Sequence, residues 1–126
     1  MPRTQISMRK GKSAEYKQAV LKSIYEAMLA AFNVPEDDQF MTINEHEPEN
    51  FIYGKNYLDI ERTDDLLMIQ ITANNTRTLE QKKALYATIV SNLVCNIHIR
   101  PEDVFIGLVE VTKENWSFGL GIAQYG

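Results

Sequence analysis

The chain has 126 residues, of which 44% are hydrophobic and 24% are charged, a balance typical of one globular domain over residues 1–126. Its formal net charge of −4 argues against a general binder of nucleic acids or anionic membranes, because both require a basic surface. The single cysteine, Cys95, excludes an intrachain disulfide, and no apolar run approaches the length that spans a bilayer. The N-terminus also lacks the apolar core of a signal peptide, so we expect a cytoplasmic protein.

The first half of the chain predicts a strand, a helix and a second strand, in that order. Residues 3–8 alternate between polar and apolar side chains, which is typical of a strand with one buried face. Ser13 is a suitable N-cap for a helix over residues 14–32, where apolar residues recur at spacings of three and four. Pro35 prevents the helix from continuing, and residues 39–45 supply the next strand.

The second half predicts the same three elements after a polar loop over residues 47–57. Residues 66–73 are almost continuously apolar, so we expect a strand that is buried on both faces. Thr78 and Gln81 have the spacing of a capping box, which predicts a sharp start for the second helix. The last long strand is expected over residues 104–111. Four residues supply the apolar stripe of the second helix: Leu79, Leu85, Ile89 and Leu93.

The two halves, about residues 2–60 and 61–126, resemble copies of one β-α-β unit. In each half the helix is followed by the tripeptide Pro-Glu-Asp and then by a strand. Joining two such units predicts an α/β (α+β) fold with a four-stranded mixed sheet and both helices on one face. The aromatic and glycine-rich tail, residues 115–126, is expected to add a short terminal hairpin.

The repeat draws attention to two charged residues. After Pro-Glu-Asp the second half continues with Val104, which suits a strand, whereas the first half has Asp38. A carboxylate at that position is explained either by an exposed loop or by a site. Arg77 directly precedes the capping Thr78, where it is either a solvated charge or a bidentate ligand for a carboxylate beside the helix N-terminus.

Pro2 is a further candidate, because an initiator methionine is usually removed ahead of so small a residue. The new N-terminus would then be a secondary amine. Model α-amino groups titrate near about 7.7–8.0, and burial or nearby cations disfavour the charged form, so such an amine suits a general base. Trp116 and Phe118 fit either a core or interface role or the wall of a substrate site.

Four short motifs occur in an order and at separations that resemble a known family. They are Met1-Pro2, the turn Val34-Pro-Glu-Asp-Asp38, the helix start Arg77-Thr-Leu-Glu-Gln-Lys82 and the tail segment Asn115-Trp-Ser-Phe-Gly119. Together they resemble the tautomerase superfamily, most closely its malonate semialdehyde decarboxylase-like branch, over nearly the whole chain. The duplicated unit is what this superfamily implies, because its long members are fused pairs of β-α-β chains.

The resemblance implies a role for each candidate residue. An amino-terminal proline is the catalytic group, here Pro2 after loss of Met1. An aspartate that positions water or polarises the substrate matches Asp38, and an arginine that binds the substrate carboxylate matches Arg77. Trp116 and Phe118 would match the aromatic wall of the substrate site. The resemblance also implies a homotrimer without a cofactor.

One position departs from the pattern of the decarboxylases. Those enzymes carry a second arginine two positions before the one that matches Arg77, and this chain has Asn75 there. Asparagine can hydrogen-bond a substrate carboxylate but cannot neutralise it. Asn75 therefore favours a tautomerase over a decarboxylase.

Three functions stay open on this basis. The first is a keto–enol tautomerase of small 2-oxo or 2-hydroxy-enoate acids, in which Pro2 carries the proton. The second is a decarboxylase or hydratase of 3-oxo acids, similar to malonate semialdehyde decarboxylase, and the third is a non-catalytic ligand-binding trimer. No metal site is expected, because His46, His98 and Cys95 are scattered without metal-ligand spacing.

Overall fold

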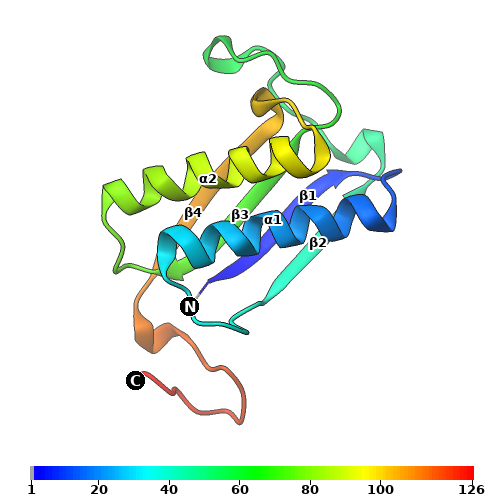
Figure 1. Cartoon of the computed structure of the whole chain (residues 1–126). Helices are drawn as coiled ribbons and strands as arrows, with labels where there is room; N and C mark the ends of the chain where they lie inside the picture. The colour runs from blue at the N-terminus through cyan, green and yellow to red at the C-terminus, as the bar shows by residue number, and fades with distance from the viewer. Residues whose placement is uncertain (1) are drawn as a thin grey trace.

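The computed structural model describes residues 2–126 and consists of one four-stranded sheet with two helices on the same face (Figure 1). The strand order is β2-β1-β3-β4, in which β1 and β2 are parallel, β3 and β4 are parallel, and the central pair is antiparallel. This arrangement confirms the predicted fold class. The elements, in chain order, are β1 (Arg3–Arg9), α1 (Ala14–Phe32), β2 (Met41–His46), β3 (Leu67–Asn74), α2 (Leu79–Ile97) and β4 (Val104–Val111).

The ends of both helices follow from local sequence signals. The hydroxyl of Ser13 accepts a hydrogen bond from the first turn of α1, and Thr78 and Gln81 form the predicted capping box at α2. Asn33 and His98 end the helices with φ angles of 50° and 57°, in the left-handed region that closes a helix. Among residues 2–126, neither helix is long and apolar enough to cross a membrane.

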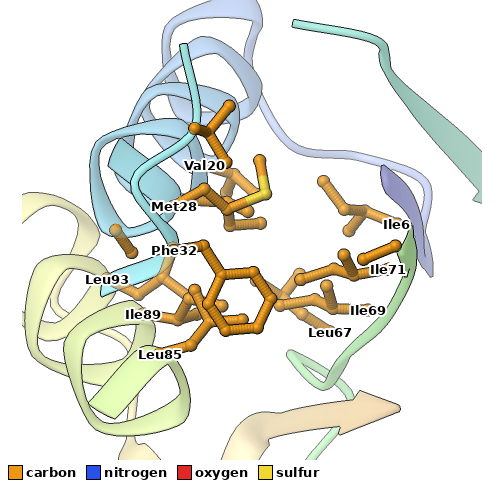
Figure 2. Close-up of a cluster of buried hydrophobic side chains, with 14 of the residues drawn as sticks. Ile6, Val20, Met28, Phe32, Leu67, Ile69, Ile71, Leu85, Ile89 and Leu93 are labelled. Atoms are coloured by element: carbon orange, nitrogen blue, oxygen red, sulfur yellow. The ribbon is translucent and has the colours of Figure 1, made fainter. Parts of the chain in front are cut away.

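The core lies between the helices and the inner face of the sheet. Figure 2 shows side chains of α1 and α2 pointing toward those of β1 and β3. Burying each large apolar side chain contributes roughly 1.5–3 kcal/mol, so this layer dominates the stability of the fold. Its fully buried members include Ile6, Val20, Ile24, Met28, Phe32, Ile69, Ile71, Leu85, Ile89 and Leu93.

Two predictions about burial are wrong. Leu79 is 61% exposed. It lies six residues before Leu85, and a rotation of about 100° per residue places it on a different face of α2 from the buried stripe that begins at Leu85. Strand β3 is buried on one face only: Ile69 is buried whereas Gln70 is exposed. The helices form a single layer, so the outer face of the sheet has no covering element among the described residues.

The predicted terminal hairpin is also wrong, because no strand follows β4 within the described chain. Gly119 and Gly121 have φ angles of 133° and 69°, which belong to turns rather than to paired strands. The side chain of Gln124 supplies hydrogen bonds to the tail in place of strand pairing. It accepts one from the N–H of Phe118 and donates one to the carbonyl of Gly119, both at 3.0 Å. The tail is therefore a series of turns that passes the end of the sheet.

Candidate functional site

The candidate site lies at the end of the sheet where the start of β1, the turn after α1, the end of β3 and the tail meet (Figure 1). Two adjoining cavities share the side chains of Phe40 and Phe118. The larger, of about 530 Å³, is lined by Asp38, Asn74 and Arg77 among others, and we call it the Arg77 cavity. The smaller, of about 220 Å³, is called the Pro2 cavity, and its other lining residues are Pro2, Arg3, Trp116 and Ser117.

Pro2 is buried directly ahead of β1. The next residues are held by the strand pairing and by a 2.9 Å hydrogen bond from the Thr4 N–H to the carbonyl of Phe40. Proline suits the first position of a strand, because it cannot donate to the ladder. Met1, whose removal we predict, lies outside the described residues.

Asp38 ends the turn that follows α1. The turn is closed by a 3.1 Å hydrogen bond from the Asp38 N–H to the carbonyl of Pro35, and the hydroxyl of Tyr25 accepts from the N–H of Asp37 at 3.1 Å. One carboxylate oxygen of Asp38, Oδ1, is buried without a hydrogen-bond partner among the described residues. Burial raises the pKa of the Asp38 carboxyl, and the positive charge of Arg77 partly opposes that rise.

Arg77 is held against the last residue of α1. Its Nη2 donates to the carbonyl of Phe32 at 3.0 Å, and its guanidinium carbon lies 4.8 Å from the centre of the Phe32 ring. A cation is favoured there by the helix C-terminus and by the face of the ring. Burial lowers the pKa of Arg77, and Asp38 opposes this effect. Arginine stays protonated at neutral pH, so the cavity holds a fixed positive charge.

The aromatic side chains of the tail form one stack beside these charges. The rings of Trp116 and Phe118 are 5.7 Å apart and nearly parallel, and Tyr125 meets Phe118 edge-on at 5.5 Å. The indole Nε1 of Trp116 donates to Oδ1 of Asn74 at 2.8 Å. The tail is thus attached to the end of β3 by a partly buried hydrogen bond.

Of the residues expected from the sequence, Asp38, Arg77 and Phe118 line the Arg77 cavity, and Pro2, Trp116 and Phe118 line the Pro2 cavity. Asn75 is exposed and lines neither of them. The fold adds to the cavities ten residues to which the sequence analysis gave no site role: Arg3, Pro35, Glu36, Asp37, Phe40, Asn74, Thr76, Lys113, Ser117 and Tyr125. Four of them, Pro35, Glu36, Asp37 and Ser117, belong to the quoted motifs, and Phe40 is an aromatic residue two positions beyond Asp38.

Comparison with known proteins shows the family of the chain. A family model described as "Tautomerase enzyme" matches residues 38–119, and a second model with the same description matches residues 2–59. The chain therefore belongs to the tautomerase family, and its relatives indicate an enzyme. It is 45% identical over 124 residues to Probable tautomerase YusQ of Bacillus subtilis (strain 168), and the match covers 98% of both chains.

Two solved structures place the fold among its relatives. Malonate semialdehyde decarboxylase is 27% identical with a TM-score of 0.92, over 98% of this chain and 95% of the other. A fused 4-OT that forms a symmetric trimer is 17% identical with a TM-score of 0.79, over 97% and 96% of the two chains, and this likeness concerns the fold alone.

The electrostatics of the site can be tested directly at Asp38. In an NMR titration we expect its carboxyl pKa above the ordinary value of 3.8, because burial disfavours the charged form. Arg77→Met should raise the pKa of Asp38 further, since the charge that opposes the shift is lost while the burial persists. The ionisation of Asp38 therefore lowers the stability of the fold as pH rises through the window from 3.8 to the raised pKa.

Arg100→Met is the matched control, because Arg100 precedes β4 whereas the cavities lie beyond its other end. It should leave the titration of Asp38 unchanged. A pKa of 3.8 or lower for Asp38 would show that burial does not dominate its ionisation. No response to Arg77→Met would show that Arg77 does not act on the carboxyl.

Proposed function

We propose that this chain is a keto–enol tautomerase of small 2-oxo or 2-hydroxy-enoate acids, with Pro2 as the proton carrier after loss of Met1. The observation that carries the proposal is the adjacency of the two cavities. A substrate whose carboxylate lies on Arg77 reaches across the shared ring of Phe118 to the buried Pro2. The reaction then needs no cofactor, because a proton is only moved between two atoms of the same molecule.

The mechanism follows from the charge of each group. A proline amine in an apolar cavity is disfavoured as an ammonium, so it can accept a proton near pH 7. Its nitrogen takes the proton of the 2-hydroxyl of an enol, the C2–O bond becomes a carbonyl, and the same proton is returned to C3. Arg77 holds the carboxylate and stabilises the negative charge that develops on the oxygen.

A decarboxylase or hydratase of 3-oxo acids is the second candidate. It is favoured by the likeness to malonate semialdehyde decarboxylase, a protein described with decarboxylase and hydratase activities and with a proline-to-alanine variant at its first position. The unpartnered Oδ1 of Asp38 would suit work on a water or on a leaving carboxylate. We rank this candidate second, because Asn75 stands where those enzymes have a second arginine. A non-catalytic trimer would leave the charges around Pro2 without a role.

Processing of the N-terminus is the first test. With Met1 attached, the Pro2 nitrogen is an amide and cannot act as a base, so activity toward enolic arylpyruvates should rise in proportion to the processed fraction. We would trim one preparation with methionine aminopeptidase and compare intact mass, melting temperature and rate before and after. Equal rates from the two forms would contradict the role of Pro2.

The second test separates Arg77 from a solvated charge. Arg77→Ala should raise KM and lower kcat/KM by about ten- to a hundredfold, the value of a lost charge-assisted hydrogen bond. Asp38→Asn should leave most of the enol–keto activity, since Pro2 alone carries the proton, but should nearly abolish a decarboxylase or hydratase activity.

Arg100→Ala serves as the control for Arg77→Ala, and thermal melts check that each variant is folded. Because Arg77 also contacts Phe32, Arg77→Lys is included: it keeps the charge and should recover part of the binding. Loss of tautomerisation in a stable Asp38→Asn variant would contradict the assignment of Pro2 as the only proton carrier.

The uncovered face of the sheet supports a homotrimer. Phe105 is 51% and Val109 is 44% exposed on β4, and Met68 lies beside Phe105 in the strand register. Exposed apolar groups gathered on one face are typical of an interface. The fused 4-OT of the same fold is a trimer. We infer that this face packs against two further copies of the chain.

Light scattering at micromolar concentration should therefore give three times the chain mass. Phe105→Glu would place a charge in the interface and should lower the mass, whereas Lys22→Glu, on an exposed position of α1, should leave it unchanged. A monomeric native protein would contradict the trimer.

A further inference from the structure

Asn74 is a buried polar residue to which no role has yet been given. It is the last residue of β3, its exposed fraction is 7%, and it lines the Arg77 cavity. Its Oδ1 accepts the 2.8 Å hydrogen bond from the indole of Trp116. An indole N–H can only donate, so the amide oxygen must face Trp116 and the NH₂ group must face away from it. Trp116 thereby fixes an orientation that an isolated amide would not have.

The NH₂ group of Asn74 is left for a ligand. Among residues 2–126 it has no hydrogen-bond partner, and it is not one of the buried unpaired polar atoms of that part of the chain. It is therefore reachable from the cavity that Asn74 lines. A side chain that is more than nine-tenths buried, with its acceptor occupied and its donors open, is arranged to donate to a bound molecule.

The position of this donor selects the atom that it would bind. Asn74 lines the Arg77 cavity and Trp116 lines the Pro2 cavity, so their hydrogen bond lies between the two. In a substrate that extends from Arg77 to Pro2, some atoms join the carboxylate to the reacting carbon. These atoms would lie beside the hydrogen bond between Asn74 and Trp116. In a 2-oxo acid the first such group carries the 2-oxygen, whereas in a simple carboxylic acid it carries no oxygen.

We propose that Asn74 donates a hydrogen bond to the 2-oxygen of the substrate, and that Trp116 is the positioning residue that aims it. This proposal rests on the tautomerase function given above and names the substrate feature that the site recognises. The charged guanidinium of Arg77 matches the full charge of the carboxylate. The neutral amide matches an oxygen that is uncharged in the enol and in the ketone and is partly negative between them.

The test is a comparison of two ligands that cannot be turned over. Phenylglyoxylate is a 2-oxo acid with no proton to enolise, and phenylacetate is the same acid without the 2-oxygen. By calorimetry the wild type should bind phenylglyoxylate more tightly. Asn74→Ala should weaken the binding of phenylglyoxylate by about three- to tenfold, the value of one neutral hydrogen bond. The affinity for phenylacetate should stay unchanged. Asn56→Ala, an exposed amide on a distant loop, is the control for both ligands.

The role of Trp116 is tested by a double-mutant cycle. Trp116→Phe keeps an aromatic ring but removes the N–H. It should therefore lower the affinity for phenylglyoxylate by about the same factor as Asn74→Ala. In the Asn74→Ala background it should cost nothing further. A purely structural attachment of the tail would instead make Trp116→Phe weaken both ligands, and would do so in either background.

Each remaining outcome bears on one proposal alone. Equal weakening of both ligands by Asn74→Ala, or equal affinity of the wild type for both, would overturn the assignment of Asn74 to the 2-oxygen. Neither binding measurement requires proton transfer. If the predicted ligand preference is found but enolic arylpyruvates are not converted, the tautomerase function fails while the role of Asn74 stands.

Discussion

Phe32 joins the hydrophobic core to the candidate site, and the position of the site's principal cation depends on it. Its side chain is 2% exposed among the residues of α1, α2 and the sheet (Figure 2). The same residue presents its ring face and its carbonyl to Arg77. Close packing leaves a core ring of this size little freedom, so Arg77 is placed by the core rather than by a flexible loop. Stability and ligand geometry are therefore coupled at one residue.

Both ends of the sheet combine ion pairs with buried polar atoms that lack a partner among the described residues. At the end of β1, Arg9 pairs with Asp64 at 3.2 Å and Lys12 pairs with Asp65 at 2.7 Å. At this end Nε of Arg9 and Nε2 of His46 are nevertheless buried without a partner among the described residues. At the opposite end, Asp38 has a buried oxygen without a partner among the described residues. A buried polar atom left in this way costs stability, which is a common property of functional sites. Unpartnered polar atoms are therefore not confined to the candidate site, and Asp38 is distinguished by lining a cavity together with Arg77.

Features encoded in short segments could be predicted, and features that depend on distant contacts could not. Thr78 and Gln81 lie three residues apart, so their capping box is visible in the sequence. The apolar run of residues 66–73 predicts a strand, and β3 confirms it. The sequence does not show whether one or both faces of the sheet are covered, and Gln70 is exposed on the uncovered face. The orientation of Asn74 depends on Trp116, which lies 42 residues further along the chain. No local pattern contains that hydrogen bond.

The balance of charge in the Arg77 cavity bears on which reaction the site favours. Loss of carbon dioxide from a 3-oxo acid requires a carboxylate that is first bound and then released as carbon dioxide. A second arginine would help to bind that carboxylate. Here the residue of β3 that lines the cavity is the neutral Asn74, whereas Asn75 is exposed and lines neither cavity. The lining holds two cations, Arg77 and Lys113, and three carboxylates, Glu36, Asp37 and Asp38, beside the amide of Asn74. These carboxylates disfavour a second negative charge on the substrate, because like charges in one cavity repel. Monocarboxylates of the 2-oxo and 3-oxo classes carry the same charge, so the preference for a 2-oxo acid rests on the proposed hydrogen bond of Asn74 rather than on the charge of the cavity.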